Sequence, residues 1–357
     1  MNKLIYTIQW AKDPQKTWSG IGYNLRNALA KHFEIEDLKL QGHCFRDYFV
    51  KLRLLKPDCG LQTVKTNRFK HSKKLDSSIP VFQFDEAFLT PNSYLFCDLC
   101  VDFLYNLKSK NPAVFNYSGF QNNPDNLLRK RAESQTNYIK NFPKRIFTLG
   151  TWLRNYLITE LQIPENKVIA VGGGINIDKT KINNSQKTGN KILFIGRDFK
   201  RKGGECVVEA FKELKKIKPN VELYIAGPKK NPLDTAIDGI TYLGDVNSTV
   251  LHNYFNLCDI FCMPSYFEAY GLVFIEALTF GLPCIGRDCF EMPYLIDDEK
   301  TGYLLKNDST EELCTLMKKA LENEEMKNTV LNMRESYLKQ YSWETVAQKC
   351  ALEILNN

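Results

Sequence analysis

The sequence lacks features that define several common classes of protein. No apolar run approaches the roughly 20 residues that span a bilayer, which argues against an integral membrane protein. Only four histidines occur in 357 residues, and none lies near the Cys97–Cys100 pair. A zinc site at that pair would therefore lack its remaining ligands. We expect the cysteines to be ordinary buried thiols in a reducing cytoplasm.

Other absences narrow the range of possible functions. The chain has no Walker-A spacing, which argues against a P-loop ATPase. No nucleic-acid-binding motif accompanies the net charge of +7, so we expect no nucleic-acid partner. That charge suits an anionic ligand, an acidic membrane surface or simply a soluble surface. No convincing aspartate cluster points to a metal site, and we expect neither a metal nor another cofactor.

What the sequence does contain is an alternation of strand-like and helix-like segments. Residues 4–9 favour a strand over a signal peptide, and a glycine-containing loop and a helical pattern follow. A polar stretch at 176–190 is typical of a linker, after which the alternation restarts more cleanly. The pattern predicts an α/β fold with two doubly wound, Rossmann-like domains facing a central cleft. Further strands are expected at 79–84, 93–100, 112–118, 145–150 and 191–196.

The loop "FIGRDFKRKGG" (194–204) is the first candidate site. A strand ends at Gly196, and Arg197 and Lys202 precede two glycines and a helix. Flexible backbone amides, a helix N-terminus and two cations suit a diphosphate. A solvated basic turn would have the same composition, and the sequence alone leaves both interpretations open.

The stretch "EAYGLVFIEA" (268–277) is the second candidate. Glu268 is expected in the loop after a strand and Glu276 about one turn into the next helix. Between them, the amides around Gly271–Leu272 suit an anion, and the carboxylates suit sugar hydroxyls. A capping role for Glu268 and a salt bridge for Glu276 would explain the pair equally well.

Near the N-terminus, Gly20 and Gly22 in "WSGIGYN" predict either a ligand-binding loop or a plain turn.

These motifs, in this order, resemble a known family. The series "FIGRDFKRKGG … YIAGP … YLGDV … CDIFCMPSYFEAYGLVFIEALTFGLPCIG" is similar to the nucleotide-sugar half of the family-4 retaining glycosyltransferases, which have the GT-B fold. Their hallmark is two glutamates separated by seven residues, here Glu268 and Glu276. The resemblance spans about residues 190–350, and the N-terminal half matches more weakly.

The resemblance implies a role for each candidate residue. Glu276 would bind the ribose hydroxyls, and Glu268 would lie against the donor sugar. Arg197 and Lys202 would neutralise the departing diphosphate, and the Gly20–Gly22 loop would close over the same phosphates. Many relatives carry a histidine near the sugar, and this sequence offers none in that place; Asp98, at an expected strand end, would occupy that neighbourhood, and a turn or structural acceptor explains it at least as well. The backbone from Ala269 through Tyr270 and Gly271 to Leu272 would contact sugar and phosphate.

The resemblance also implies an activity. It is the retaining, metal-independent transfer of a sugar, with a hexose favoured, from a UDP- or GDP-linked donor to a glycan or lipid-linked acceptor, in surface polysaccharide or glycolipid assembly. A nucleotide-sugar-binding subunit without catalysis and a GT-B sugar-nucleotide epimerase are the alternatives. A phosphorylase would need a Schiff-base lysine and a longer chain.

The implied organisation has four parts. Residues 1–175 would bind the acceptor, 176–190 would link the two domains, 191–335 would bind the nucleotide sugar, and 336–357 would form a helix crossing back to the first domain.

Residues 51–74 carry eight Lys or Arg among apolar residues. Such a stretch binds anionic membranes or is simply solvated. We expect a cytoplasmic protein with peripheral contact to the inner face of the membrane.

Overall fold

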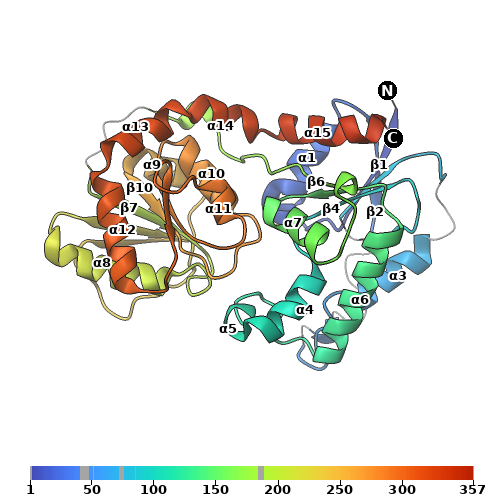
Figure 1. The fold of residues 1–357 in the computed structure, drawn as a ribbon, viewed down its shortest axis with the longest axis horizontal. Coiled ribbons are helices and arrows are strands. Elements are labelled where there is room, and N and C mark those ends of the chain that lie inside the picture. Colours follow the sequence, from blue (N-terminus) through green and yellow to red (C-terminus); the bar gives the residue numbers. More distant parts are fainter. Residues whose placement is uncertain are drawn as a thin grey trace. The chain divides into compact units, whose positions relative to one another are not determined.

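The computed structural model describes residues 2–40, 48–50, 52–71, 76–84, 86–183 and 189–356. Of the basic stretch 51–74, Lys51 and residues 72–74 lie outside this range. The chain divides into two compact units (Figure 1). The first unit comprises residues 1–174 and 342–357, and the second comprises residues 175–341. Residues 336–341, which were expected in the closing helix, therefore lie in the second unit.

The first unit is built on a parallel sheet with the strand order β2-β1-β3-β4-β5-β6. Its strands are β1 (Lys3–Ile8), β2 (Glu34–Lys39), β3 (Val81–Gln83), β4 (Ser93–Cys97), β5 (Arg145–Thr148) and β6 (Val168–Ala170). Its α-helices are α1 (Ile21–Leu29), α3 (Leu61–His71), α4 (Val101–Lys110), α5 (Pro112–Phe115), α6 (Asp125–Asn141), α7 (Thr151–Thr159) and α15 (Trp343–Leu355).

The second unit repeats the architecture with the parallel order β12-β11-β10-β7-β8-β9. Its strands are β7 (Lys191–Ile195), β8 (Glu222–Ala226), β9 (Ile240–Gly244), β10 (Ile260–Cys262), β11 (Cys284–Arg287) and β12 (Gly302–Leu305). Its α-helices are α8 (Gly204–Ile217), α9 (Ser248–Leu257), α10 (Leu272–Thr279), α11 (Met292–Leu295), α12 (Thr310–Glu322), α13 (Glu324–Asn332) and α14 (Arg334–Gln340).

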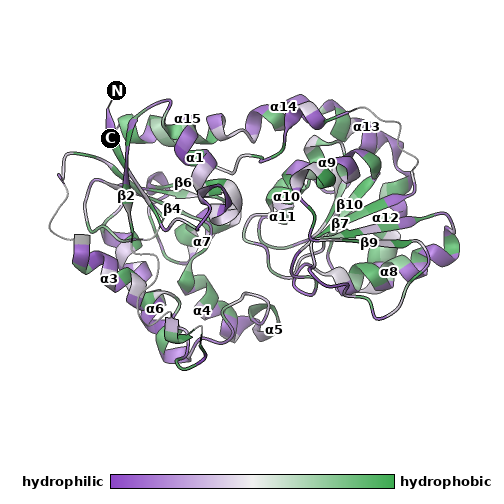
Figure 2. Cartoon of the chain, turned by 180° about the vertical axis from the view of Figure 1, so that it is seen from behind, coloured by the Kyte–Doolittle hydropathy of each residue, from purple (hydrophilic) through white to green (hydrophobic). Residues whose placement is uncertain are grey.

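The burial pattern explains the two sheets. Every residue of β4 and β10 is buried, as expected for parallel strands that are covered on both faces. The helices are apolar on one side only. Along α8, for example, Val207, Phe211 and Leu214 are buried, while polar residues alternate with them along the ribbon (Figure 2). Helix α8 packs beside α12 (Figure 1). The predicted pair of doubly wound α/β units is therefore confirmed.

One predicted strand is wrong. The run 112–118 begins with the short helix α5, because Pro112 suits the first turn of a helix and Asn111 caps it. The Asn111 Oδ1 accepts a hydrogen bond from the Val114 amide at 3.1 Å. The apolar residues of this run had favoured a strand, but the cap at Asn111 and the proline at the first helical position favour a helix.

The prediction of buried thiols at the Cys97–Cys100 pair is confirmed. Both side chains are buried and free, and burial raises the pKa of the Cys100 thiol to about 12. Among the described residues, no helix combines the length and the apolar character that a bilayer span requires.

Candidate functional site

The candidate site of the second unit lies where β7 and β10 end. These two strands are neighbours in the sheet, so their loops leave from the same edge. The loop after β7 carries Lys202, and the loop after β10 carries Glu268. The Lys202 ammonium forms an ion pair with Glu268 Oε2. The structure thus brings together two side chains that the sequence placed 66 residues apart.

Hydrogen bonds lock the two loops together. The Arg201 carbonyl accepts from the Tyr266 amide at 2.9 Å and from the Ser265 hydroxyl at 3.2 Å. In return, Arg201 Nη1 donates to the Phe267 carbonyl at 2.7 Å and lies 4.0 Å from Glu268 Oε2. Sequence reasoning did not select Arg201, because its partners are mostly backbone groups that leave no pattern in the sequence.

Two glycines make this close approach possible. Gly203 has φ of +78°, and a Cβ there would meet the Pro264 carbonyl oxygen at 2.5 Å. Gly271 has φ of +92°, and a Cβ there would meet Phe274 at 2.8 Å and Glu268 at 3.3 Å. Any other residue would therefore separate the loops or displace Glu268.

Behind the Glu268 loop, Arg287 supports Tyr266. The guanidinium carbon lies 4.1 Å from the centre of the Tyr266 ring. The same guanidinium donates to Asp308 at 3.0 Å and to the Pro264 carbonyl at 3.3 Å. The loop is thus fixed from both sides by arginines.

Glu276 is the fifth residue of α10, as the predicted one-turn offset requires. Its Oε1 lies 3.4 Å from the backbone nitrogen of Asn176, 100 residues away in the sequence. The carboxyl keeps part of its surface exposed, but the surrounding atoms desolvate it. This desolvation raises its pKa to about 7. A desolvated carboxylate is stabilised by partners that donate hydrogen bonds to it. Along the loop before α10, Tyr270 is buried, whereas Ala269 and Leu272 are partly exposed.

Arg197 lies apart from the Lys202–Glu268 pair. Its side chain is 79% exposed, and its Nε lies 3.4 Å from Asp245, which follows β9. The expected joint action of Arg197 and Lys202 on one diphosphate therefore remains a prediction.

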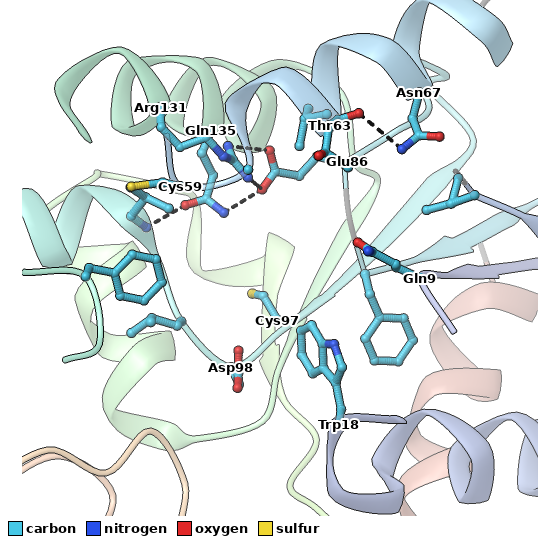
Figure 3. A pocket seen from close by; sticks show the side chains of 17 residues that line it. Gln9, Trp18, Cys59, Thr63, Asn67, Glu86, Cys97, Asp98, Arg131 and Gln135 are labelled. Atoms are coloured by element: carbon cyan, nitrogen blue, oxygen red, sulfur yellow. Dashed lines mark hydrogen bonds and ion pairs between the residues drawn. The ribbon is translucent and has the colours of Figure 1, made fainter. Parts of the chain in front are cut away.

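The predicted glycine loop and Asp98 belong to the first unit. Gly20, with φ of +92°, immediately precedes α1, whereas Gly22 lies within its first turn. The expectation that Gly22 forms part of a loop is therefore wrong. A Cβ on Gly22 would meet Ile8 Cδ1 at 2.7 Å, so this glycine lets α1 pack closely on β1. Asp98 directly follows β4 and lines a cavity of the first unit (Figure 3).

Among the described residues, no group of three His, Cys, Asp or Glu side chains is placed to hold a metal ion.

The sequence of the second unit is similar to a known family. Residues 176–336 match the family model described as "Glycosyl transferases group 1". The resemblance to GT-B glycosyltransferases is thereby confirmed over that range.

Relatives of known sequence match about half of the chain. The chain is 32% identical over 183 residues to the alpha-monoglucosyldiacylglycerol synthase of Acholeplasma laidlawii, a match that covers 48% of this chain and 44% of that protein. It is 25% identical over 182 residues to the lipopolysaccharide 1,2-N-acetylglucosaminetransferase of Salmonella typhimurium, covering 46% and 48%. The matched region is thus about half the length of these relatives.

Solved structures match the whole chain. Sucrose-phosphate synthase from Thermosynechococcus elongatus has a TM-score of 0.71 at 17% identity, and the match covers 100% of this chain and 99% of that one. WaaG, a glycosyltransferase involved in lipopolysaccharide biosynthesis, has a TM-score of 0.64 at 15% identity, with 99% and 100% covered. These likenesses show that the chain has the GT-B fold.

Proposed function

We propose that the protein transfers a hexose from a UDP- or GDP-linked sugar to an acceptor hydroxyl, with retention at the anomeric carbon and without a bound metal. The observation that carries this proposal is the nearly buried Lys202–Glu268 pair at the carboxyl edge of the second sheet. It supplies a fixed cation where the N-terminus of α10 and the loop after β7 also favour an anion.

In the proposed reaction, the bond between the anomeric carbon and the diphosphate oxygen breaks, and a bond to the acceptor oxygen forms. Lys202 and Arg197 neutralise the charge that develops on the departing diphosphate. Glu276 accepts hydrogen bonds from the ribose hydroxyls, and Glu268 holds Lys202 in place beside the donor sugar. The acceptor proton passes to the departing phosphate, so no general base of the protein is assigned.

The names of related proteins support the proposed setting. Two relatives are named for making a glycolipid and for modifying lipopolysaccharide. A protein of similar fold, HepE from Anabaena, was solved in complex with UDP-glucose (TM-score 0.66, 12% identity). We therefore propose a glycan or lipid-linked acceptor, surface polysaccharide or glycolipid assembly, and a cytoplasmic location.

Donor binding should depend on Glu276 and on pH. Glu276→Ala should weaken the affinity for the nucleotide sugar by about 10- to 100-fold, because hydrogen bonds to a charged group are lost. In the wild type, lowering the pH below 7 protonates this carboxyl and weakens binding, by up to about tenfold for each pH unit. Thermal shift and calorimetry with UDP, GDP, ADP and their sugar conjugates at pH 6, 7 and 8 measure both effects.

Matched variants control this experiment. Glu276→Gln should bind weakly with little pH dependence, whereas Glu311→Gln, on the exposed face of α12, should behave as wild type. Unchanged affinity in Glu276→Ala would refute the ribose role. Strong donor binding without sugar transfer to any acceptor would instead favour the non-catalytic binding subunit.

We further propose that the first unit contacts an anionic membrane surface. Its exposed apolar side chains include Leu54 (66%) and Phe69 (86%), with Tyr48, Leu52 and Leu55 nearby in sequence. Exposed cations are interspersed, namely Arg53, Lys56, Lys65 and Lys70. Helix α3 turns Leu61 and Val64 inward and leaves Phe69 exposed, so the apolar part of this surface comes from Phe69 and from residues 48–50 and 52–55. Apolar insertion combined with positive charge suits anionic lipid.

Vesicle binding tests this surface. The wild type should co-sediment with vesicles that contain phosphatidylserine at low salt, and added salt or pure phosphatidylcholine should release it. Leu54→Asp with Phe69→Asp should abolish binding. Ile217→Asp, at an equally exposed position of the second unit, should not change it. If the double variant binds like the wild type, this surface is not the contact.

A further inference from the structure

The Lys202–Glu268 pair is neutral as a whole, although the proposed reaction needs a cation beside the departing diphosphate. Both side chains are nearly buried, at 13% and 11% exposure, so each charge is compensated mainly by the other. Glu268 would therefore compete with the diphosphate for the Lys202 ammonium. A second cation at Glu268 would remove this competition.

Arg201 places a second cation at the same carboxylate. Its Nη1 lies 4.0 Å from Glu268 Oε2, the oxygen that Lys202 also contacts. The other carboxylate oxygen, Oε1, accepts no hydrogen bond from the described part of the chain. Both cations thus gather at one oxygen of Glu268, and the other oxygen is left to accept a hydrogen bond from a hydroxyl group.

The backbone of the neighbouring loop holds Arg201 close to this position. Arg201 Nη1 donates a hydrogen bond to the Phe267 carbonyl at 2.7 Å. Each terminal nitrogen of a guanidinium carries two N–H groups, so a second one remains for Glu268. A charge-assisted hydrogen bond is about 2.8 Å long, and a movement of about 1 Å would therefore complete the contact with Oε2. The hydrogen bond to the carbonyl that precedes Glu268 keeps the loop in place during this movement.

The other acidic neighbour of Arg201 compensates its charge only weakly. Asp198 Oδ2 lies 3.4 Å from Arg201 Nε, but the Asp198 side chain is 58% exposed. Solvent screens such a pair. Asp198 Oδ1 also accepts a hydrogen bond from the Arg201 backbone amide at 3.3 Å, which ties this carboxylate to its own loop. The positive charge of Arg201 is therefore available to the less exposed Glu268.

We propose that Arg201 is a positioning residue that acts through Glu268. As negative charge develops on the departing diphosphate, Arg201 completes its hydrogen bond to Glu268 Oε2. The Lys202 ammonium then contacts the phosphate oxygens without leaving its place, and no proton is transferred. The inference rests on the proposed function and deepens it, because it names the group that makes the charge of Lys202 available.

Release of UDP or GDP by the full chain tests the inference. The probes are UDP-glucose, UDP-N-acetylglucosamine and GDP-mannose, with and without octyl glycosides as acceptors. Arg201→Gln should lower kcat by about 30- to 100-fold, whereas the Kd of the nucleotide sugar from calorimetry should change less than about threefold. The reason is that Glu268 competes for Lys202 only as charge develops. Arg201→Lys keeps the charge, and its kcat should stay within about fivefold of the wild type.

A double-mutant cycle shows whether Arg201 acts through Glu268. Glu268→Gln removes the competing carboxylate charge, so adding Arg201→Gln to it should lower kcat by no more than about threefold further. Residues that act independently would instead give effects that multiply.

Arg154 in the first unit is the matched control. Its side chain is 27% exposed, against 26% for Arg201. It also bridges a backbone carbonyl, that of Val168 at 3.2 Å, and a carboxylate, that of Glu165 at 2.6 Å. Arg154→Gln should leave both kcat and Kd unchanged. Thermal stabilisation by UDP or GDP should be retained in Arg201→Gln and Arg201→Lys, which also shows that both variants fold.

The outcomes are distinct. The inference is overturned if Arg201→Gln turns over like the wild type, if Arg201→Lys is as impaired as Arg201→Gln, or if the effects in the cycle multiply. Loss of nucleotide stabilisation together with kcat in Arg201→Gln would show a structural role and would also overturn it. In each of these cases turnover by the wild type shows that the proposed function stands. A wild type that releases no nucleotide from any probe would refute the proposed function, and the inference with it.

Discussion

Replacing both Arg197 and Lys202 with alanine should lower sugar transfer by about 10²- to 10³-fold, the loss typical of removing a group that stabilises charge in a transition state. Most of the effect should come from Lys202. Its ammonium is nearly buried and held by Glu268, so it needs little reorganisation as the diphosphate departs. Arg197 is exposed to solvent beside Asp245, so its side chain must move before it can contact the diphosphate.

Steady-state kinetics of both single variants and the double variant measure this difference. Lys200→Ala is the matched control, because Lys200 lies in the same loop but is exposed and paired with Glu205 at 3.3 Å. Lys202→Ala leaves Glu268 without its ammonium partner, so Lys202→Ala with Glu268→Gln shows whether folding contributes to the loss. Turnover near that of the wild type in the double alanine variant would remove the diphosphate assignment.

The second large effect concerns stability. Arg131→Met should lower the free energy of unfolding of the first unit by about 3 kcal/mol, because the buried Glu86 carboxylate loses its bidentate partner and is left with Arg68, whose Nη2 lies 3.5 Å away. All four tryptophans of the chain, at positions 10, 18, 152 and 343, lie in this unit. Tryptophan fluorescence during urea unfolding therefore reports on this unit.

Helix α6 also supplies the control for this measurement. Arg129 forms an exposed ion pair with Glu133 at 3.0 Å, so Arg129→Ala should cost no more than about 1 kcal/mol. Glu86→Gln combined with Arg131→Met should recover part of the loss, since the buried carboxylate is then removed together with its bidentate partner. Equal effects of Arg129→Ala and Arg131→Met would show that the buried network contributes no more than a surface pair.

The sequence predicted the candidate site well where its residues lie within one continuous strand–loop–helix segment. A strand, a loop with the right residues and a helix occur together in 191–217 and in 260–279, and parallel neighbours bring such loops to one edge. Lys202, Glu268 and Glu276 could therefore be singled out before the fold was seen. Gly22 was misplaced because a glycine that allows helix–strand packing and one that allows a turn look the same in sequence.

Other features depend on contacts that no local pattern reveals. Glu86 and Arg131 are 45 residues apart, and Glu276 meets a backbone amide 100 residues away. Neither the left-handed backbone of Trp18 nor the backbone partners of Arg201 follow from residue type. Such features become visible only when the sheet has fixed the order of its strands.

The interlocked loops of the second unit have a consequence for engineering. Because Gly203 abuts the Pro264 carbonyl and Arg201 exchanges hydrogen bonds with Tyr266 and Phe267, residues 196–204 and 263–271 behave as one transplantable module. A chimera that imports one of these segments from a homologue carries a mismatched interface, whereas a chimera that imports both keeps it. Libraries intended to change donor preference should therefore recombine the two segments together.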